Sequence, residues 1–282
     1  MSEPTARQVA IVGAGVMGTG IAALVLGHGV PVTLVDVDDT TLRAARVRIE
    51  QQLRHAQLMG ALPAGTAPGE LTTSVYLADT ANATAVIEAI VELPAEKAKV
   101  LAEVSAAVRP GTPLISNTSG IPIAELARSV ARPEELLGTH FMNPSYLIKM
   151  VEVSRGPQTG DAAVAAVVEL LSTLNRKAVI VRDAPGFVTS RLLHPMINAA
   201  ARIVGEGTAT VEAVDELMEG CLGHPTGPLR TADLIGLDNL ADSLQVLHER
   251  TGDPSCKPAD LLLEKVRQGD LGRKSGRGFY AY

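Results

Sequence analysis

The sequence has few cysteines, few aromatic residues and no excess of positive charge. Its two cysteines, Cys221 and Cys256, cannot build a disulfide framework or a thiolate metal cluster, and they fit a reducing compartment. Four tyrosines, three phenylalanines, no tryptophan and a formal charge of −6 provide neither a stacking platform nor a basic surface. We therefore expect a cytoplasmic protein with no nucleic-acid partner and no metal site.

One stretch raises the question of a membrane. Residues 9–35 contain no Asp, Glu, Lys or Arg, and an uncharged run of this length is long enough to cross a bilayer. Glycines and Pro31 interrupt this stretch, and no basic cluster precedes it as in a secretory signal. Two buried strands around a buried helix explain the same pattern, so we expect no membrane partner.

The length of 282 residues and the hydrophobic fraction of 46% predict about two domains with substantial cores. Apolar, β-branched runs predict strands at residues 8–12, 31–35, 72–76, 85–90, 114–117, 136–141, 149–153 and 178–181. Helical spacing between these runs predicts a mostly parallel sheet covered by helices on both faces. After residue 184 the helical period continues without a convincing strand. We expect an α/β domain over residues 1–184 and an all-α domain over residues 185–282.

The glycines at positions 13, 15 and 18 form a dinucleotide-binding pattern between a strand and a helix. Gly13 permits the turn, Gly15 lets backbone amides approach a pyrophosphate, and Gly18 allows the helix to pack closely on the strand. Val16 and Met17 lie in the same turn, where the helix N-terminus offers N–H donors to phosphates. This pattern predicts a dinucleotide site.

Asp36 ends the next predicted strand, where its carboxylate can accept hydrogen bonds from an adenosine ribose. Its negative charge would repel a 2′-phosphate, and residues 37–39 offer no arginine to receive one. The sequence therefore favours NAD over NADP. A helix N-cap is the alternative role for Asp36, and both roles are compatible.

His140 differs from the other histidines because it ends a predicted strand, at the edge where open α/β sheets place ligands. The polar residue Asn143 follows it closely. Glu152 interrupts an apolar run where a buried strand would prefer an aliphatic residue. Taken alone, Glu152 is typical of an edge strand that faces water.

In this order the motifs resemble the NAD-dependent L-3-hydroxyacyl-CoA dehydrogenases over essentially the whole chain. The resemblance lies in residues 13–18, 116–119, 140–144, 150–153, 185–188, 227–229, 236–238 and 274–280. It implies a Rossmann-like, NAD-binding domain followed by an all-α domain that builds a homodimer. It also implies an active site in the cleft between the domains.

The resemblance further implies that C3 of a 3-hydroxyacyl thioester gives a hydride to the nicotinamide while a base removes the hydroxyl proton. His140 matches the base and Glu152 its partner, and a neighbouring carboxylate suits this chemistry because it holds the imidazole in one tautomer. Ser119 and Asn143 match positions that bind the substrate's oxygen and order the site.

Three further residues match positions near the cofactor in this family. Glu92 and Lys97 match positions that face the cofactor's ribose, and Asn117 matches a position near the nicotinamide. Capping or turn chemistry explains Asn117 equally well.

The sequence departs from the family pattern around the substrate. Ser190 stands where the family usually has an asparagine that contacts the reacting part of the substrate, and its shorter side chain leaves room or recruits water. Ser145 and Tyr146 replace small apolar residues with two hydroxyls. We therefore expect a pocket that accepts a more polar acyl chain.

A third departure concerns the carrier. Family members that bind CoA display lysines on the helix after the second strand, whereas here only Arg54 and His55 are basic. Either CoA is held elsewhere, or the thioester arrives on an acyl carrier protein that docks on Leu58, Met59 and Leu62. Related dehydrogenases in polyketide extender-unit pathways oxidise short polar acyl groups, such as glyceryl, on carrier proteins.

Two other functions remain open at this point. A dehydrogenase of free hydroxy acids, like the gulonate and carnitine dehydrogenases, would share the fold and a similar Asn-Pro-x-Tyr block. A catalytically idle NAD-binding protein, like the lens crystallins built on this scaffold, is the other alternative. The presence of both His140 and Glu152 favours an enzyme over the idle protein.

Overall fold

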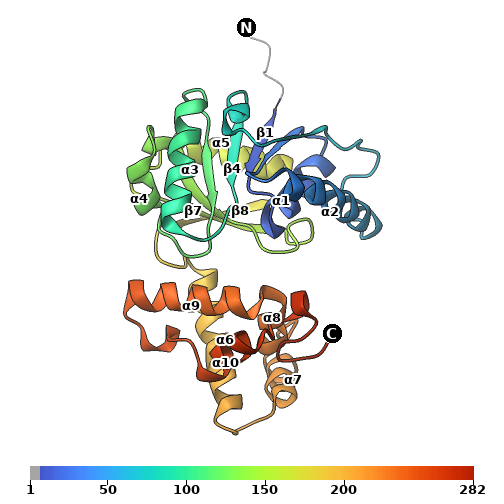
Figure 1. Ribbon diagram of the computed structural model, residues 1–282, viewed down its shortest axis with the longest axis vertical. Coiled ribbons are helices and arrows are strands. Elements are labelled where there is room, and N and C mark those ends of the chain that lie inside the picture. Colours follow the sequence, from blue (N-terminus) through green and yellow to red (C-terminus); the bar gives the residue numbers. More distant parts are fainter. Residues whose placement is uncertain (1–6) are drawn as a thin grey trace. The chain divides into compact units, whose positions relative to one another are not determined.

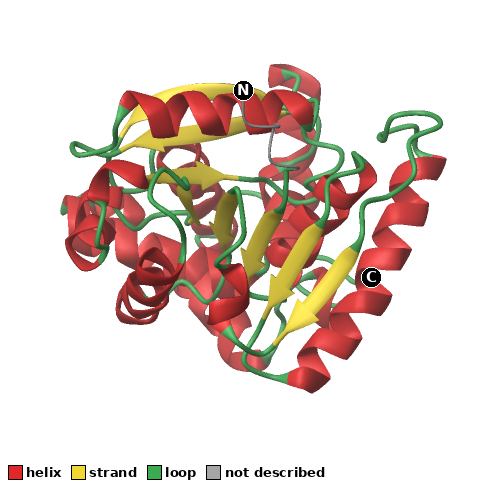
Figure 2. Ribbon diagram, turned by 90° about the horizontal axis from the view of Figure 1, so that it is seen from above, coloured by secondary structure: helices red, strands yellow, loops and turns green. Residues whose placement is uncertain are grey.

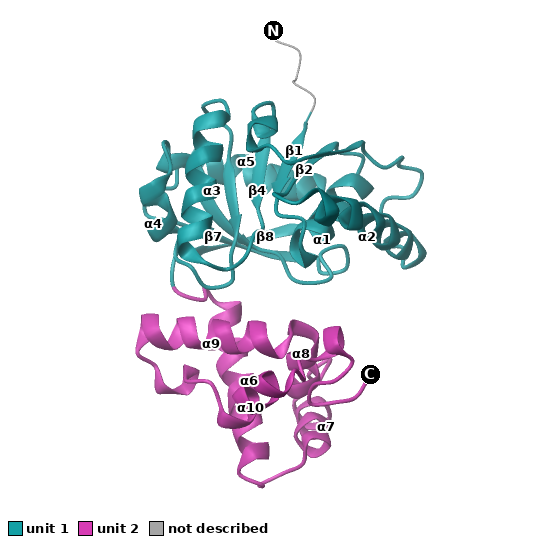
Figure 3. Ribbon diagram, in the orientation of Figure 1, with its two compact units in different colours: residues 1–184 teal, residues 185–282 magenta. Residues whose placement is uncertain are grey.

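The computed structural model describes residues 7–282 (Figure 1). The chain divides into two compact units, residues 1–184 and residues 185–282, which Figure 3 shows in different colours. None of the helices in the described part of the chain combines the length and apolar character that a membrane crossing requires. Residues 7–282 also hold no group of three or more His, Cys, Asp or Glu side chains arranged to bind a metal ion.

The first unit is built on one eight-stranded sheet with the order β3-β2-β1-β4-β5-β6-β7-β8. The strands are β1 (Val9–Val12), β2 (Val32–Val35), β3 (Leu71–Ser74), β4 (Ala85–Glu88), β5 (Leu114–Asn117), β6 (Leu136–His140), β7 (Met150–Arg155) and β8 (Lys177–Arg182). All neighbouring strands are parallel except β6 and β7, which are antiparallel. The carboxyl ends of β1, β4, β5 and β6 therefore lie along one edge of the sheet.

Helices cover both faces of this sheet, and Figure 2 shows the twisted strands with helices around them. They are α1 (Val16–Gly27), α2 (Asp39–Leu58), α3 (Pro94–Ala107), α4 (Ile123–Leu126) and α5 (Asp161–Thr173), with single 3₁₀ turns at η1 (Leu77–Thr80), η2 (Ala127–Ser129) and η3 (Pro133–Glu135). Side chains of a strand alternate between faces. Val9 and Ile11 accordingly join a core with α1, α2 and α5, whereas Ala10 and Val12 join a second core with α3 and α4. The charge-free run of residues 9–35 is thus a buried strand, helix and strand, as predicted.

The second unit is helical. It contains α6 (Thr189–Gly205), α7 (Val211–Leu222), α8 (Pro228–Ile235), α9 (Leu237–Thr251) and α10 (Asp260–Gln268), with 3₁₀ turns at η4 (Pro254–Cys256) and η5 (Arg273–Ser275). Its core gathers aliphatic side chains from α6, α8, α9 and α10, including Ile197, Leu229, Leu244 and Leu262. The predicted fold class, a Rossmann-like and mostly parallel sheet domain followed by an all-α domain, is confirmed.

Two buried aspartates fasten the last residues of the chain to this unit. Asp233, on α8, accepts hydrogen bonds from the backbone N–H groups of Phe279 at 2.8 Å and Tyr280 at 2.9 Å, and from the Tyr282 hydroxyl at 3.1 Å. Asp215, on α7, accepts a hydrogen bond from the Tyr280 hydroxyl at 2.9 Å. Burial and the hydrogen bond to Asp215 raise the pKa of the Tyr280 phenol, so this hydroxyl keeps the proton that it donates. We call these contacts the tail clamp.

Candidate active site

The glycine loop joins β1 to α1, and its three motif glycines meet different requirements. Gly13 has a φ of +106°, and a Cβ there would lie 2.5 Å from the carbonyl oxygen of Ala89. At Gly18 a Cβ would lie 1.8 Å from the carbonyl oxygen of Gly13. Among the described residues, no atom lies within 4 Å of a Cβ built at Gly15, whose φ of −71° suits any residue. Contacts within the chain require glycine at positions 13 and 18. At position 15, only a bound group would require glycine.

A pyrophosphate is such a group, because α1 begins at Val16 and its first N–H groups are directed at the space in front of Gly15. The residues present therefore fit a dinucleotide. NAD would be held here by the backbone of residues 13–18, and a methyl group on residue 15 would occupy the space that the phosphates need.

The substitution Gly15→Ala is expected to leave the fold intact and to raise the Kd for NADH about tenfold or more, equivalent to about 1.4 kcal/mol. The reason is that Ala fits the backbone but separates the amides from the phosphates. Fluorescence titration with NADH measures the affinity. Gly220→Ala is the matched control, since a Cβ there also meets no described atom within 4 Å. An unchanged Kd in Gly15→Ala would contradict this assignment of the phosphate site.

Asp36 ties the glycine loop to the end of β2. Its Oδ2 accepts a hydrogen bond from the N–H of Ala14 at 2.7 Å, and its Oδ1 accepts one from the N–H of Asp38 at 3.3 Å. The alternative role of Asp36 as the N-cap of α2 is wrong, because Asp38 caps that helix by accepting from Thr40 and Thr41. These hydrogen bonds, with that from the Thr41 hydroxyl the strongest, lower the pKa of the Asp38 carboxyl. Asp36 therefore holds the glycine loop and does not cap α2, and its contact with a ribose stays a prediction.

His140 and Glu152 face each other across the antiparallel pair β6 and β7. They are direct partners in the strand register, and His140 Nδ1 lies 3.5 Å from Glu152 Oε2. Both residues are only 7% exposed. Glu152 is therefore not an edge residue facing water. The carboxylate favours the tautomer with its proton on Nδ1, which puts the lone pair on Nε2, where the ring can take a proton.

The strand β5, which lies beside β6 in the sheet, leads into a loop with other polar contacts. Asn117 ends β5, and its Oδ1 accepts a hydrogen bond from the N–H of Phe141 at 3.1 Å, so it ties the end of β5 to the residue after His140. This contact joins two distant segments and is neither a cap nor a local turn, so the predicted place of Asn117 near the nicotinamide stays a prediction. Ser119 is half-buried in the loop after β5, and Asn143 is exposed in the loop after β6.

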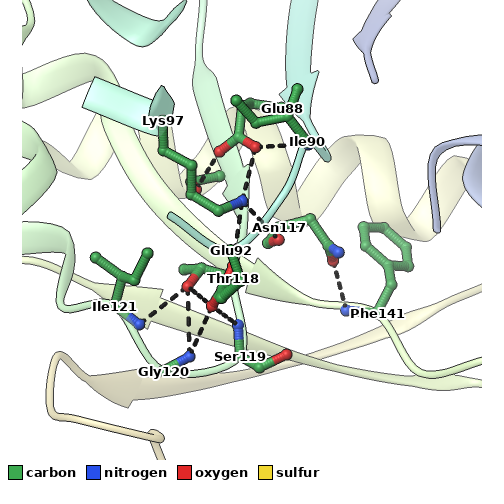
Figure 4. A network of polar contacts seen from close by, with 11 residues as sticks. Glu88, Ile90, Glu92, Lys97, Asn117, Thr118, Ser119, Gly120, Ile121 and Phe141 are labelled. Carbon is green, nitrogen blue, oxygen red and sulfur yellow. Dashed lines mark hydrogen bonds and ion pairs between the residues drawn. The ribbon is translucent and has the colours of Figure 1, made fainter. Parts of the chain in front are cut away.

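Glu92 lies next to residues 118–120, which we call the Ser119 loop, and Lys97 lies beyond Glu92, toward Glu88 (Figure 4). Glu92 Oε1 accepts hydrogen bonds from the N–H groups of Ser119 at 2.8 Å and Gly120 at 3.1 Å. Lys97 is fully buried, and its Nζ lies 2.7 Å from Glu88 Oε1 and 3.3 Å from Glu92 Oε2. Any influence of Lys97 on a bound ribose must therefore pass through the residues that enclose it.

Comparison with known proteins decides the family. Residues 8–184 match the family model described as 3-hydroxyacyl-CoA dehydrogenase, NAD binding domain. Residues 186–282 match the model described as 3-hydroxyacyl-CoA dehydrogenase, C-terminal domain. The chain belongs to the 3-hydroxyacyl-CoA dehydrogenase family. It is an NAD-dependent oxidoreductase.

Relatives of this dehydrogenase match it from end to end. It is 40% identical over 279 residues to a probable 3-hydroxybutyryl-CoA dehydrogenase of Bacillus subtilis, covering 98% of this chain and 97% of the relative. The crystal structure of Mycobacterium tuberculosis FadB2 superposes with a TM-score of 0.92 at 39% identity, over 99% of this chain and 100% of that one. The (S)-3-hydroxybutyryl-CoA dehydrogenase PaaH1 of Ralstonia eutropha gives a TM-score of 0.86 at 38% identity, over 98% and 99% of the two chains.

The two hydroxyls that distinguish this dehydrogenase after Pro144 point into the first unit. The Tyr146 hydroxyl lies 2.9 Å from Nδ1 of His55 on α2, and the two rings meet edge to face. Ser145 Oγ lies against α1, 3.3 Å from the position that a Cβ on Gly20 would take. Both residues are buried. They give no support to the expected polar acyl pocket, because their hydroxyls are turned toward the helices.

A residue that the sequence analysis missed holds this loop in place. Arg176, immediately before β8, is buried and donates hydrogen bonds to the carbonyl oxygens of Ser145 at 3.2 Å and Tyr146 at 2.8 Å. Burial lowers the pKa of its guanidinium. No local signal marks Arg176 in the sequence, since its partners lie 30 residues or more away.

Ser190 lies in the second unit, in the first turn of α6. The residue is 1% exposed, and its Oγ has no hydrogen-bond partner among the described residues. A buried hydroxyl without a partner is unusual, because buried polar atoms are normally hydrogen-bonded. This hydroxyl is therefore an unsatisfied buried group, and its contact with a substrate stays a prediction.

Proposed function

We propose that the chain oxidises the 3-hydroxyl group of a short 3-hydroxyacyl-CoA to a ketone, with NAD as the oxidant. The observation that carries this proposal is the His140–Glu152 pair, which lies on the same sheet as the glycine loop and at its carboxyl edge. The names of the relatives, which are 3-hydroxybutyryl-CoA dehydrogenases, support the substrate class.

In the proposed reaction, His140 Nε2 removes the proton of the 3-hydroxyl group while the C3–H bond breaks. When bound, NAD supplies the acceptor for the hydride that leaves C3. Glu152 stabilises the imidazolium that forms and keeps the ring in place. The proton then leaves His140 for solvent, so one alcohol and one NAD⁺ give one ketone, one NADH and one proton. Ser119 and Asn143 would bind the oxygen that becomes the carbonyl, and Ser190 would contact the acyl group.

An acyl carrier protein is the second candidate for the carrier, and the surface of α2 is the observation that favours it. Of its two basic residues toward the carboxyl end, His55 is bound to Tyr146, and Arg54 lies 3.8 Å from Glu50. Leu58 is 86% exposed and Met59 is 57% exposed at the end of the helix. This surface offers little to the phosphates of CoA and presents apolar side chains to a protein.

The carrier is tested by measuring NADH formation from matched thioesters, with the same 3-hydroxyacyl or glyceryl group on CoA and on an acyl carrier protein. The CoA proposal predicts a kcat/KM at least about tenfold higher on CoA, which is about 1.4 kcal/mol of transition-state binding. The reverse preference would establish the second candidate. Turnover of free hydroxy acids without turnover of thioesters would overturn both and select a dehydrogenase of the gulonate or carnitine type.

The variant Leu58→Glu separates the two carriers further. A new carboxylate on an apolar docking surface would lower turnover of the carrier-protein thioester but leave the CoA thioester unaffected. Val47→Glu, on the same helix and also exposed, is the matched control.

We also propose that the protein is a homodimer formed through the second unit. Leu192, Leu217 and Leu222 are more than half exposed on α6 and α7, and exposed large apolar side chains are candidates for burial in an interface between subunits. Sedimentation analysis measures the oligomeric state.

A further inference from the structure

The ammonium group of Lys97 contacts two carboxylates, one inside the sheet and one beside the Ser119 loop. Lys97, from α3, is 0% exposed, and it contacts Glu88 at 2.7 Å and Glu92 at 3.3 Å. It also donates a hydrogen bond to the carbonyl oxygen of Asn117 at 3.4 Å. A buried ammonium is costly unless paired, so these partners determine where Lys97 lies. Figure 4 shows the group as one connected network.

Glu88 anchors this network in the sheet. It is the last residue of β4 and is 1% exposed. Besides Lys97, its carboxylate accepts hydrogen bonds from the N–H of Ile90 at 2.8 Å and from the Ser116 hydroxyl at 2.6 Å. Three donors from β5, α3 and the turn after β4 therefore fix its position. Because it is enclosed, Glu88 can act on a ligand only through another residue.

Glu92 forms the outer end of the network. Its side chain is 35% exposed, and one of its oxygens accepts hydrogen bonds from the N–H groups of Ser119 and Gly120, as described above, and from the Thr118 hydroxyl. Its other oxygen faces Lys97. Glu92 thus connects the interior ammonium to the loop that carries Ser119.

We propose that Glu88 is a positioning residue for cofactor and substrate binding. Its charge balances much of the Lys97 ammonium, which lets Glu92 keep one oxygen for the Thr118 hydroxyl and the amides of Ser119 and Gly120. Without the charge on Glu88, Lys97 would draw Glu92 inward, and the loop would lose its acceptor. The role of the loop in substrate binding rests on the proposed function, whereas the effect on cofactor affinity rests only on NAD binding.

The test uses Glu88→Gln, which keeps the shape of the side chain but removes its charge. We expect the Kd for NADH to rise about tenfold, equivalent to about 1.4 kcal/mol, together with a lower Tm. The double variant Glu88→Gln/Lys97→Met removes the uncompensated ammonium as well. It should recover much of the Tm, because replacing a buried ion pair by neutral groups is often tolerated, and it should lower the Kd again, because no uncompensated ammonium remains to draw Glu92 away from the loop.

The Kd for NADH, measured at a temperature where every variant is folded, distinguishes positioning from a merely structural role. A Kd that stays raised in the double variant while the Tm recovers would overturn the proposal, as would an unchanged Kd in Glu88→Gln. Glu135→Gln is the matched control, since Glu135 is a buried, ion-paired carboxylate that precedes β6 at the other end of the strand. It should leave the NADH affinity unchanged.

Two further measurements complete the experiment. If Glu88→Gln does not fold, Ser116→Ala, which removes one donor to Glu88, should raise the Kd for NADH in the same direction by about threefold, and no change would overturn the proposal. Thioester oxidation by the unaltered enzyme is measured separately. Its absence would refute the proposed function, while the NADH affinities would still decide the role of Glu88.

Discussion

Replacing His140 by glutamine is expected to lower kcat for thioester oxidation by about 10²–10⁴-fold, the range that one positioned acid–base group contributes. Glutamine can form hydrogen bonds at this position but cannot take a proton near neutral pH. The Kd for NADH should remain close to that of the unaltered enzyme, because the glycine loop and Asp36 lie at other strands, β1 and β2. Steady-state kinetics and NADH titration measure the two quantities.

Glu152→Gln is the control for this variant, because it keeps an oxygen opposite Nδ1 and removes only the charge. Glu152→Gln should lower kcat by a smaller factor than His140→Gln does. If His140→Gln turned over at the normal rate, His140 would not be the base.

Asp233→Ala is expected to lower the free energy of unfolding by about 3 kcal/mol, since hydrogen bonds to a buried charged group contribute about 1.5–3 kcal/mol and the N–H groups left behind are unsatisfied. The substitution removes the acceptor in the tail clamp for Phe279, Tyr280 and Tyr282. Urea denaturation measures the stability, and limited proteolysis of the last residues reports their release.

Asp242→Ala, an exposed aspartate on α9, serves as the comparison for this second variant. Surface substitutions of this kind usually change stability by less than about 0.5 kcal/mol. An equal effect of the two substitutions would show that the tail is held by its aromatic packing and not by the aspartate.

The glycine loop could be predicted from the sequence because its requirements are local. Gly13 and Gly18 are needed by contacts within a strand, a turn and a helix that follow one another, and β1 and β2 have the apolar composition of buried strands.

The end of one strand differs from the sequence prediction. The sequence predicts one strand over residues 85–90, whereas β4 ends at Glu88. The carboxylate of that residue accepts a hydrogen bond from the N–H of Ile90, which fits the turn at this point.

The rest depends on contacts between distant segments. Glu152 alone suggested a residue facing water, and only the register of β6 with β7 places it opposite His140. Lys97 lies in a charged stretch of α3 that is typical of a solvated helix, yet the packing of α3 beside β4 and β5 buries it completely. The side-chain directions of Ser145 and Tyr146 depend on α1 and α2, which the motif around Pro144 does not reveal.

The antiparallel ladder between β6 and β7 has a consequence for how enzymes of this type can diversify. The spacing of His140 and Glu152 is set by rungs of the sheet, not by residues 141–149 that connect the two strands. Changes in that connection can therefore leave the two side chains opposite each other. Variation at two of its exposed positions, Ile148 and Lys149, is accordingly expected to be tolerated by the pair.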